Sequence, residues 1–254
     1  MNRFTQISKI REKLSSGLYS VGSWIQIPDA SISEIMGKSG YDWVAVDLEH
    51  GSVSVSQLPN LFRAIELGGT LPLARVAQGG AKECKQALDA GAGGIIIPMI
   101  ENANQLANVI SVCRWPPSGT RGVGFSRANT FGKYFEDYSV EAENPLIVAM
   151  IENINAVNDL DKILNVKGLD AIFVGPYDLS ASMGITGKFD ELEFINAIEK
   201  IKNLCAKKGI ACGMHIVKPD TDLLKRRISE GYQFIAYSMD SVFITTSAEI
   251  PNLK

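Results

Sequence analysis

The chain has 254 residues, of which 46% are hydrophobic and 21% are charged, and its formal net charge is −3 at pH 7. This composition is typical of a globular protein with a substantial core. Its lysines and arginines are scattered, so we expect no binding to nucleic acid or to an anionic membrane surface. We expect a cytoplasmic protein, because the first residues lack the apolar run of a signal peptide and no later segment is long enough to span a bilayer.

Short apolar runs alternate with amphipathic stretches along the chain. Eight runs are predicted to be strands, at 19–27, 42–47, 71–76, 94–99, 146–151, 170–175, 210–216 and 233–238. Helical spacing of apolar residues predicts helices at 31–38, 56–67, 81–89, 103–113, 156–164, 192–207 and 221–230. This alternation predicts parallel strands joined by crossover helices.

Eight β/α units in a chain of this length fit one closed (β/α)8 TIM barrel, with residues 1–254 as a single domain. Average domain size would suggest two domains, but no Pro- or Ser-rich linker divides the chain. The alternative is an open, doubly wound α/β sheet. That alternative is the weaker one, because no G-x-G-x-x-G motif follows the first predicted strand.

In TIM barrels the catalytic residues come from the C-terminal ends of the strands, and several predicted strands of this chain end in polar residues. The second strand leads into Asp47, Glu49 and His50, one of only two histidines in the chain. A histidine beside carboxylates can act as a general acid or base, and the alternative is a polar surface turn. Repetition of polar residues at other strand ends favours an active site.

Arg75 lies inside the apolar run of the third predicted strand. An unpaired buried charge is costly, so this arginine requires an anionic partner. We expect Arg75 to bind an anion or an oxyanion of the substrate. The alternative is a structural ion pair with a carboxylate at another strand end.

Glu152 and Asp178 follow the fifth and sixth predicted strands, which are neighbours in a barrel. Two carboxylates suit a hard divalent ion such as Mg²⁺ or Mn²⁺, and a substrate with adjacent carboxylate and keto oxygens could take two further ligand positions. One alternative is that Asn153 and Asp178 cap helices. A glycosidase pair is another alternative, which the nearby arginine and histidine fit poorly.

The seventh predicted strand ends at His215, and Lys218 follows it. We expect a histidine that caps a strand end and a solvated lysine. The functional alternative is a Schiff-base lyase that uses Lys218 without a metal, because a lysine at this end of a barrel can form an imine with a keto acid.

Several phrases extend over most of the chain. They are Gly22-Ser-Trp, Tyr41-Asp-Trp-Val-Ala-Val-Asp-Leu-Glu-His, Leu73-Ala-Arg-Val, Gly94-Ile-Ile-Ile-Pro-Met, Trp115-Pro-Pro-Ser-Gly-Thr-Arg-Gly-Val-Gly, Met150-Ile-Glu-Asn and Phe173-Val-Gly-Pro-Tyr-Asp-Leu-Ser. Because it contains all of these phrases, the sequence resembles the HpcH/HpaI family of metal-dependent pyruvate aldolases, of the 4-hydroxy-2-oxoheptanedioate aldolase type. That family belongs to the phosphoenolpyruvate/pyruvate barrel superfamily.

The resemblance implies a lyase that cleaves a 4-hydroxy-2-oxo acid to pyruvate and an aldehyde, and that catalyses the reverse addition. It implies a divalent cation, Mg²⁺, Mn²⁺ or Co²⁺, bound by Glu152 and Asp178. It also implies a homo-oligomer, a hexamer whose protomers exchange the last barrel helix.

The same resemblance implies roles for the other site residues. Arg75 would hold the pyruvyl oxygens, and His50 would be the acid/base that acts on the 4-hydroxyl group. Asp47 and Asp89 would orient and tune that histidine. The pyruvate carboxylate would bind the backbone at the start of a helix, at Gly175, Pro176, Tyr177 and Asp178.

One departure from the family pattern concerns Met150, because many relatives have a glutamine two positions before the metal-binding glutamate. Two further alternatives therefore stay open. The same site could decarboxylate oxaloacetate or a related 2-oxo acid, or the barrel could be catalytically silent and bind a keto acid or a partner. Arg121 or Arg127 is available to an acidic substrate tail in a loop near the site.

Overall fold

The strands of this computed structural model, which describes residues 2–248 and 250, form one closed parallel barrel in the order β1 to β8. They are β1 Ser20–Ile25, β2 Trp43–Asp47, β3 Leu71–Arg75, β4 Gly94–Ile97, β5 Leu146–Ile151, β6 Ala171–Val174, β7 Ala211–Ile216 and β8 Phe234–Met239. The TIM barrel is confirmed, and the open sheet is wrong because β1 pairs with β8. Residues 1, 249 and 251–254 of the predicted single domain lie outside the described residues.

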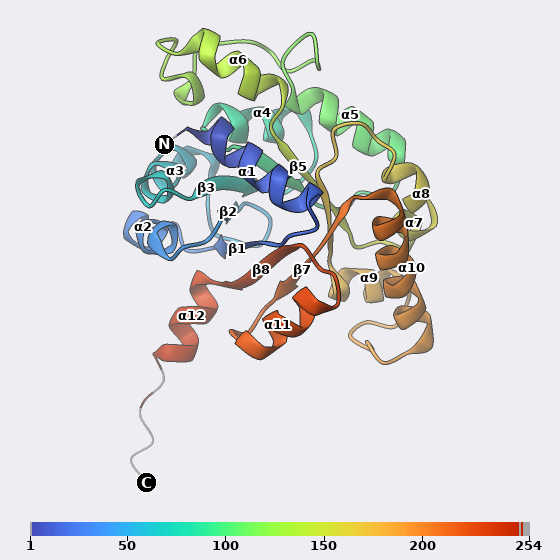
Figure 1. Cartoon of the computed structure of the whole chain (residues 1–254). Helices are drawn as coiled ribbons and strands as arrows, with labels where there is room; N and C mark the ends of the chain where they lie inside the picture. Colours follow the sequence, from blue (N-terminus) through green and yellow to red (C-terminus); the bar gives the residue numbers. More distant parts are fainter. Residues whose placement is uncertain (1, 249, 251–254) are drawn as a thin grey trace.

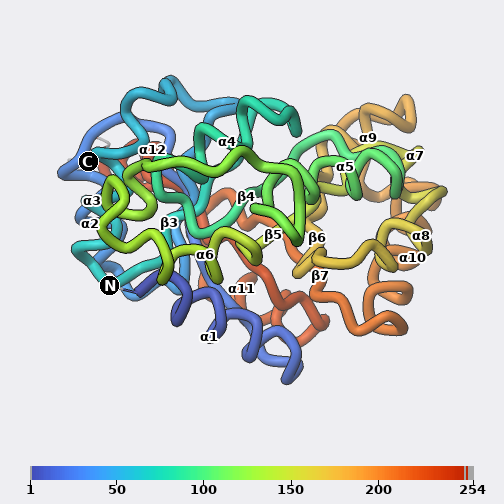
Figure 2. The backbone as a smooth tube through the Cα atoms, turned by 90° about the horizontal axis from the view of Figure 1, so that it is seen from above, coloured from blue at the N-terminus to red at the C-terminus, as the bar shows by residue number. Residues whose placement is uncertain are grey.

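Helices surround the barrel, as the view from above shows (Figure 2). They are α1 Arg3–Ser15, α2 Ala30–Lys38, α3 Leu58–Leu67, α4 Ala81–Asp89, α5 Ala103–Cys113, α6 Phe135–Glu143, α7 Ile154–Asn158, α8 Leu160–Ile163, α9 Pro176–Ser182, α10 Leu192–Lys208, α11 Thr221–Ser229 and α12 Asp240–Ser247. The predicted helices are present, with that at 156–164 divided into α7 and α8. None of the described helices is long and apolar enough to cross a membrane.

Two helices, α1 and α6, were not predicted. The helices α9 and α12 were expected only without ranges, as the helix that begins at Gly175 to Asp178 and as the exchanged last helix. In α1 only Ile7, Ile10 and Leu14 are buried among many charged residues, so its apolar stripe is narrow. These three side chains join the cluster that fills the barrel. Figure 1 shows α1 crossing the barrel. Arg11 and Lys13 of α1 bond to Asp170 and Asp42, which lie just before β6 and β2, so α1 closes the end at which the strands begin.

The interior of the barrel explains where the site lies, because side chains along a strand alternate between its two faces. Residues 43 and 45 of β2, 71 and 73 of β3, 148 and 150 of β5, and 211 of β7 face the interior cluster. The next residues in these series are Asp47, Arg75, Glu152 and, after Gly213, His215. The polar site is therefore the layer of inward-facing side chains at the C-terminal mouth of the barrel.

The layer below the site is tightly packed. The rings of Trp43 and Phe234 stack with centroids 4.4 Å apart, and Trp24 packs edge-on against Trp43 and Phe173. Gly22 is required here, since a Cβ atom at this position would lie 2.0 Å from Trp43 Cδ2. This aromatic layer gives the mouth a rigid floor.

Candidate active site

Arg75 and Asp47 are register partners on adjacent strands and form a two-point ion pair. Arg75 Nε and Nη2 donate to Asp47 Oδ1 and Oδ2 at 2.8 and 2.6 Å, and Gln26 Nε2 donates to Oδ2 at 3.0 Å. Asp47 is fully buried, which alone would raise its pKa, but the hydrogen bonds and charge of Arg75 lower the pKa instead. The guanidinium also lies 4.6 Å from the Trp24 ring centroid, so Arg75 is held on two sides.

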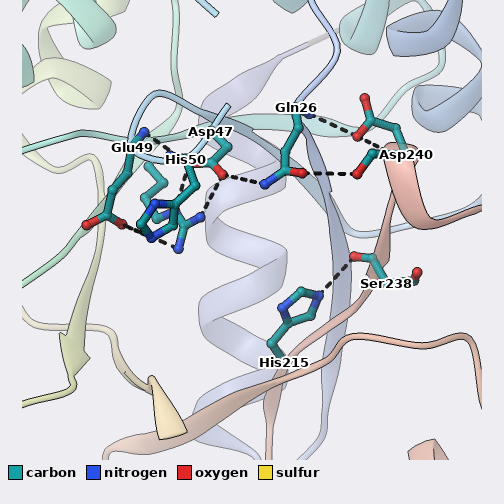
Figure 3. A network of polar contacts seen from close by, with 9 residues as sticks. Gln26, Asp47, Glu49, His50, His215, Ser238 and Asp240 are labelled. Carbon is teal, nitrogen blue, oxygen red and sulfur yellow. Dashed lines mark hydrogen bonds and ion pairs between the residues drawn. The ribbon is translucent and has the colours of Figure 1, made fainter. Parts of the chain in front are cut away.

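The segment after β2 is folded around the same carboxylate. Asp47 Oδ1 accepts the backbone N–H groups of Glu49 and His50 at 3.1 and 3.2 Å. Glu49 Oε2 lies 3.4 Å from Arg75 Nη1 and 3.7 Å from His50 Nε2 (Figure 3). The His50 side chain is 60% exposed, so it can reach a ligand in the mouth.

These contacts change the expected part of Asp47. Its carboxylate is saturated by Arg75, Gln26 and two backbone N–H groups. The carboxylate beside the His50 ring is that of Glu49. Asp47 therefore positions Arg75 and the loop that carries His50, and it does not contact the imidazole itself.

Glu152 is 3% exposed and anchors the other side of the mouth. Its Oε1 accepts the backbone N–H of Met99 at 2.6 Å. Met99 has a positive φ of 52°. Burial, together with the negative charges of Glu49 and Asp178, raises the pKa of Glu152 to about 7. Gly175 makes room for this carboxylate, because a Cβ atom there would lie 2.7 Å from Glu152 Oε2.

The helix that follows β6 brings the Asp178 carboxylate close enough to Glu152 for its charge to affect the Glu152 pKa. Gly175 is its N-cap and Pro176 its first residue, so Asp178 lies in the first turn of α9 and is not its cap. Asn153, by contrast, does cap a helix, since its side chain accepts the Asn155 N–H at 2.8 Å. The structure describes no side chain that caps the first turn of α9, so its N–H groups can bind an anion.

The donor set fits a hard divalent cation. Burial and the negative charge of Asp178 raise the pKa of both Glu49 and Glu152. Glu49 Oε2 is also a buried oxygen without a hydrogen-bond partner among the described residues. A cation beside these carboxylates would remove that repulsion. Across residues 2–248, no group of three or more His, Cys, Asp or Glu side chains could hold a metal alone, so substrate and water would have to complete the coordination.

On the opposite side of the mouth, His215 Nε2 lies 3.2 Å from the Ser238 carbonyl oxygen (Figure 3). Burial lowers the pKa of His215 to about 4, so the ring is neutral at neutral pH. Lys218 is exposed in the loop after β7. It lacks the desolvated surroundings that activate a Schiff-base lysine.

A sequence profile of the HpcH/HpaI aldolase/citrate lyase family matches residues 20–246, from β1 into α12. The chain belongs to this family.

Named relatives within the family agree with that assignment. A 2-keto-3-deoxy-L-rhamnonate aldolase of Shigella dysenteriae is 34% identical over 94% of this chain and 90% of its own length. A hydroxypyruvate/pyruvate aldolase of Roseobacter denitrificans is 32% identical over 96% of this chain and 95% of its own. These matches make the chain a lyase of the class II aldolase family.

Solved structures agree with the fold. A HpcH/HpaI aldolase/citrate lyase family protein from Burkholderia cenocepacia superposes with a TM-score of 0.88 at 28% identity. The superposition covers 94% of this chain and 96% of the other.

Asp89 is not brought to His50 within one chain of this aldolase-family barrel. It is the last residue of α4, which runs from the C-terminal ends of the strands back toward their beginnings. Asp89 instead lines an outer hollow between α3 and α4 with Arg63 and Arg127. Burial raises the pKa of Asp89, and the charges of Arg121 and Lys85 oppose that rise.

The two arginines suggested for an acidic substrate tail also have other partners. Arg127 pairs with Glu66 and donates to the Ala90 carbonyl at 2.9 Å. Arg121 is buried against the rings of Trp115 and Tyr138. Neither contacts the residues at the mouth of its own barrel.

Three further residues at the mouth were not singled out from the sequence. Gln26 links Asp47 to Ser241, whose Oγ donates to Gln26 Oε1 at 3.0 Å. Trp24 supports Arg75, and Met99 supplies the N–H that holds Glu152. The inward series of β1 points to Trp24, but no sequence signal reveals the other two contacts.

Met150, the departure from the family pattern, is 4% exposed and packs in the interior cluster directly below the site. It lies in β5 two residues before Glu152, which follows the strand, so both side chains point to the same inward side. A thioether cannot donate a hydrogen bond to the substrate as a glutamine amide can.

Proposed function

We propose that this protein is a divalent-metal-dependent aldolase that cleaves a 4-hydroxy-2-oxo acid to pyruvate and an aldehyde, and that it catalyses the reverse addition. The observation that carries the proposal is that a fixed guanidinium, an exposed histidine and three carboxylates converge at the C-terminal mouth of the barrel. Arg75 faces Glu49 across 3.4 Å, and Glu49, Glu152 and Asp178 share one electrostatic environment. Positive and negative groups arranged in this way suit a reaction in which an enolate forms.

Glu152 and Asp178 are the proposed ligands of the cation, which we expect to be Mg²⁺, Mn²⁺ or Co²⁺. When bound, this cation would supply Lewis-acid polarisation of the substrate's keto group. In the segment Gly175 to Asp178, the backbone N–H groups of Tyr177 and Asp178 would hold the carboxylate of the pyruvyl unit, because they open α9 and no side chain of the described residues caps them. Pro176 has no N–H, and the Gly175 N–H donates to the Ile151 carbonyl at 3.3 Å.

Arg75 is proposed to bind the pyruvyl oxygens and to stabilise the charge that develops on the enolate. Its Nε and Nη2 are used by Asp47, which leaves the Nη1 side facing Glu49 and the mouth. Because Asp47 fixes the guanidinium before substrate binds, little reorganisation is needed during the reaction.

His50 is proposed to remove the proton of the 4-hydroxyl group when the C3–C4 bond breaks, directly or through a water molecule. Its exposed ring and its Glu49 neighbour at 3.7 Å agree with that role. Protonation of the enolate at C3 then gives pyruvate. Asp89 could contribute to this site only from a second copy of the chain.

The test of this proposal is a screen of pyruvate with a panel of aldehydes, run on chelator-treated protein with and without Mg²⁺, Mn²⁺ and Co²⁺. The expected result is metal-dependent formation of a 4-hydroxy-2-oxo acid with at least one aldehyde. Oxaloacetate turnover without any aldol product would favour the decarboxylase instead. No turnover of either kind would indicate a silent keto-acid-binding barrel.

Borohydride reduction distinguishes this chemistry from an imine mechanism. We expect that borohydride added with pyruvate leaves the protein mass unchanged, because Lys218 is exposed and the enolate needs no imine. Mass spectrometry of the intact and digested protein provides the measurement. A reduced pyruvyl adduct on Lys218 would contradict the metal mechanism, and Lys218→Ala is the matched control.

We further propose that the chain assembles as a hexamer in which the last helix is exchanged between protomers. Figure 1 shows α12 projecting away from the barrel. Only Asp240 of α12 is buried, where its carboxylate accepts the N–H groups of Gln26 and Ile27 at 2.9 Å each. The helix α11 has no buried residue, and Ile35 on α2 is 65% exposed. A second copy would cover these surfaces.

Light scattering at micromolar concentration tests the assembly, and we expect a mass several times that of one chain. Ile35→Lys and Ile244→Lys place charges on the exposed apolar positions of α2 and α12, so each should weaken the assembly. A stable monomer of the unaltered protein would contradict the proposal. Pro251, expected to follow the exchanged helix, lies outside the described residues.

A further inference from the structure

The backbone of Met99 has an unusual conformation beside Glu152. Met99 lies in the loop 98–102 between β4 and α5, has a φ of 52° and is 45% exposed, whereas Ile100 next to it is fully buried. A left-handed conformation is unfavourable for a residue other than glycine, and it persists only where its surroundings impose it. The contacts on either side of Met99 must therefore hold it.

A side chain from another element holds each peptide group beside Met99. The Met99 N–H donates to Glu152 Oε1 at 2.6 Å. The Met99 carbonyl oxygen accepts Gln105 Nε2 at 3.0 Å, and Gln105 Oε1 accepts the Glu101 N–H at 2.8 Å. Gln105, in the first turn of α5, thus spans the loop from residue 99 to residue 101 and opposes rotation of the peptide group after Met99.

Gln105 makes a contact that an ordinary helix cap does not need. Asn102 is the N-cap of α5, and its side chain accepts the Gln105 N–H at 2.9 Å. A capping side chain at the third helical position needs only an acceptor, so glutamate serves there as well as glutamine. The bond from Gln105 Nε2 to the Met99 carbonyl requires a donor, which a carboxylate lacks. The amide of Gln105 is therefore suited to hold Met99 as well as to cap α5.

The loop 98–102 is also joined to the segment that follows β5. The Glu101 carboxylate accepts Asn153 Nδ2 at 3.4 Å and Asn155 Nδ2 at 3.3 Å. The Ala103 N–H donates to Asp159 Oδ2 at 2.9 Å. These contacts fix the loop beside the segment after β5.

The Met99 N–H occupies one oxygen of Glu152 and leaves the other for a ligand. Oε1 accepts the N–H, whereas Oε2 lies on the side of Gly175, where a Cβ atom would be 2.7 Å from it. Gly175 is the N-cap of α9, whose first turn carries Asp178. A carboxylate that is already held in this orientation loses less side-chain freedom when it binds a cation.

We propose that Gln105 is a positioning residue that holds Met99 in its left-handed conformation, so that the Met99 N–H orients Glu152 toward the divalent cation. The inference rests on the function proposed above, in which Glu152 binds that cation. Without Gln105, the φ of Met99 returns to the negative region and its N–H turns away from Glu152. Loss of a contact that orients a metal ligand lowers metal affinity about 10–100-fold.

Titration of metal-free protein with Mn²⁺ tests the inference. Gln105→Met keeps nearly the same side-chain length but makes neither hydrogen bond, so it should lower the Mn²⁺ affinity at least about tenfold. Asn102→Ala is the matched control, because it removes a cap from the same helix and leaves both bonds of the Gln105 amide in place. Equal losses of affinity in the two variants, or no loss in Gln105→Met, would overturn the inference.

Glycine at position 99 separates a hold on Met99 from general support of α5. Glycine adopts a positive φ without a steric penalty, so Met99→Gly should make Mn²⁺ binding nearly independent of Gln105. The effect of Gln105→Met is measured with and without Met99→Gly, as a double-mutant cycle. An undiminished effect in the glycine background would overturn the inference.

The amide resonance of Met99 reports the same contact without metal or turnover. The chain contains seven methionines, so ¹⁵N-methionine labelling gives few signals, and Met99→Gly identifies that of Met99. We expect a low-field amide proton that exchanges slowly in metal-free protein, because it bonds to a carboxylate at 2.6 Å. Both features should be lost in Gln105→Met and in Gln105→Glu, which keeps the capping acceptor but has no donor for the Met99 carbonyl.

An unchanged Met99 signal in these two variants would overturn the inference even for an inactive protein. Absence of Mn²⁺ binding by the unaltered protein would instead contradict the function proposed above.

Discussion

Glu152→Gln is expected to lower the rate of metal-dependent pyruvate turnover by about 10³-fold or more and to leave the barrel folded. The glutamine carbonyl can still accept the Met99 N–H that Glu152 accepts at 2.6 Å. The substitution removes only the negative charge that is proposed to bind the cation. Turnover with added Mg²⁺, Mn²⁺ or Co²⁺ provides the measurement.

The pH dependence of stability gives this variant an independent check. The pKa of Glu152 is raised from 4.5 to about 7 in the folded protein. The folded state therefore binds more protons than the unfolded state between these values, and the free energy of unfolding of metal-free protein falls as pH rises through this window. The loss is up to about 3 kcal/mol and should be missing from Glu152→Gln.

Asp178→Asn is the companion variant, because it removes the second proposed ligand at an exposed position where stability should change little. Isothermal titration with Mn²⁺ should show weaker binding in both variants. Full activity of either variant, or of the unaltered protein in excess chelator, would contradict the metal site.

The second large effect is a difference between the reactions lost in Arg75→Ala and those lost in His50→Ala. Arg75→Ala should depress aldol cleavage, pyruvate proton exchange and oxaloacetate decarboxylation together, because all three pass through the same enolate. His50→Ala should slow cleavage by about 10²–10⁴-fold while sparing much of the other two, since neither needs the 4-hydroxyl proton removed. Equal loss of all three reactions in both variants would contradict these separate roles.

Arg75→Ala also needs a folding control, since it leaves the fully buried Asp47 without its cation. Breaking such a pair from one side costs about 3–5 kcal/mol. The double variant Arg75→Met with Asp47→Asn removes both charges and should recover much of that stability. If activity stays lost when stability returns, the guanidinium acts in the reaction and not only in the fold.

The fold could be predicted from the sequence because short apolar runs of strand length alternate with stretches of helical periodicity. The inward periodicity also accounts for Asp47, Arg75 and Glu152, which continue buried series to the mouth. The helix α1 was not predicted, because its apolar stripe is narrow and most of its other residues are polar or charged.

Contacts across the barrel could not be read from the sequence. Nothing in the spacing shows that Asp47 is saturated by Arg75 and Gln26, so that Glu49 is the neighbour of the His50 ring. Asp89 differs from these contacts, because a crossover helix between parallel strands must run back toward the strand beginnings. The place of Asp89 at the end of α4, away from the mouth, could therefore have been inferred from the predicted fold. The contact of His215 Nε2 with the Ser238 carbonyl depends on the positive φ of Ser238, which no residue pattern signals.

Deuterium incorporation into the pyruvate methyl group, followed by mass spectrometry in deuterated buffer, tests the proposed chemistry without knowledge of the aldehyde. The protein is first treated with chelator and then supplied with Mg²⁺, Mn²⁺ or Co²⁺. We predict exchange only after a divalent cation is added, and none in Glu152→Gln. Undiminished exchange in the chelated protein, or no exchange with any cation, would contradict metal-dependent formation of a pyruvate enolate at this site.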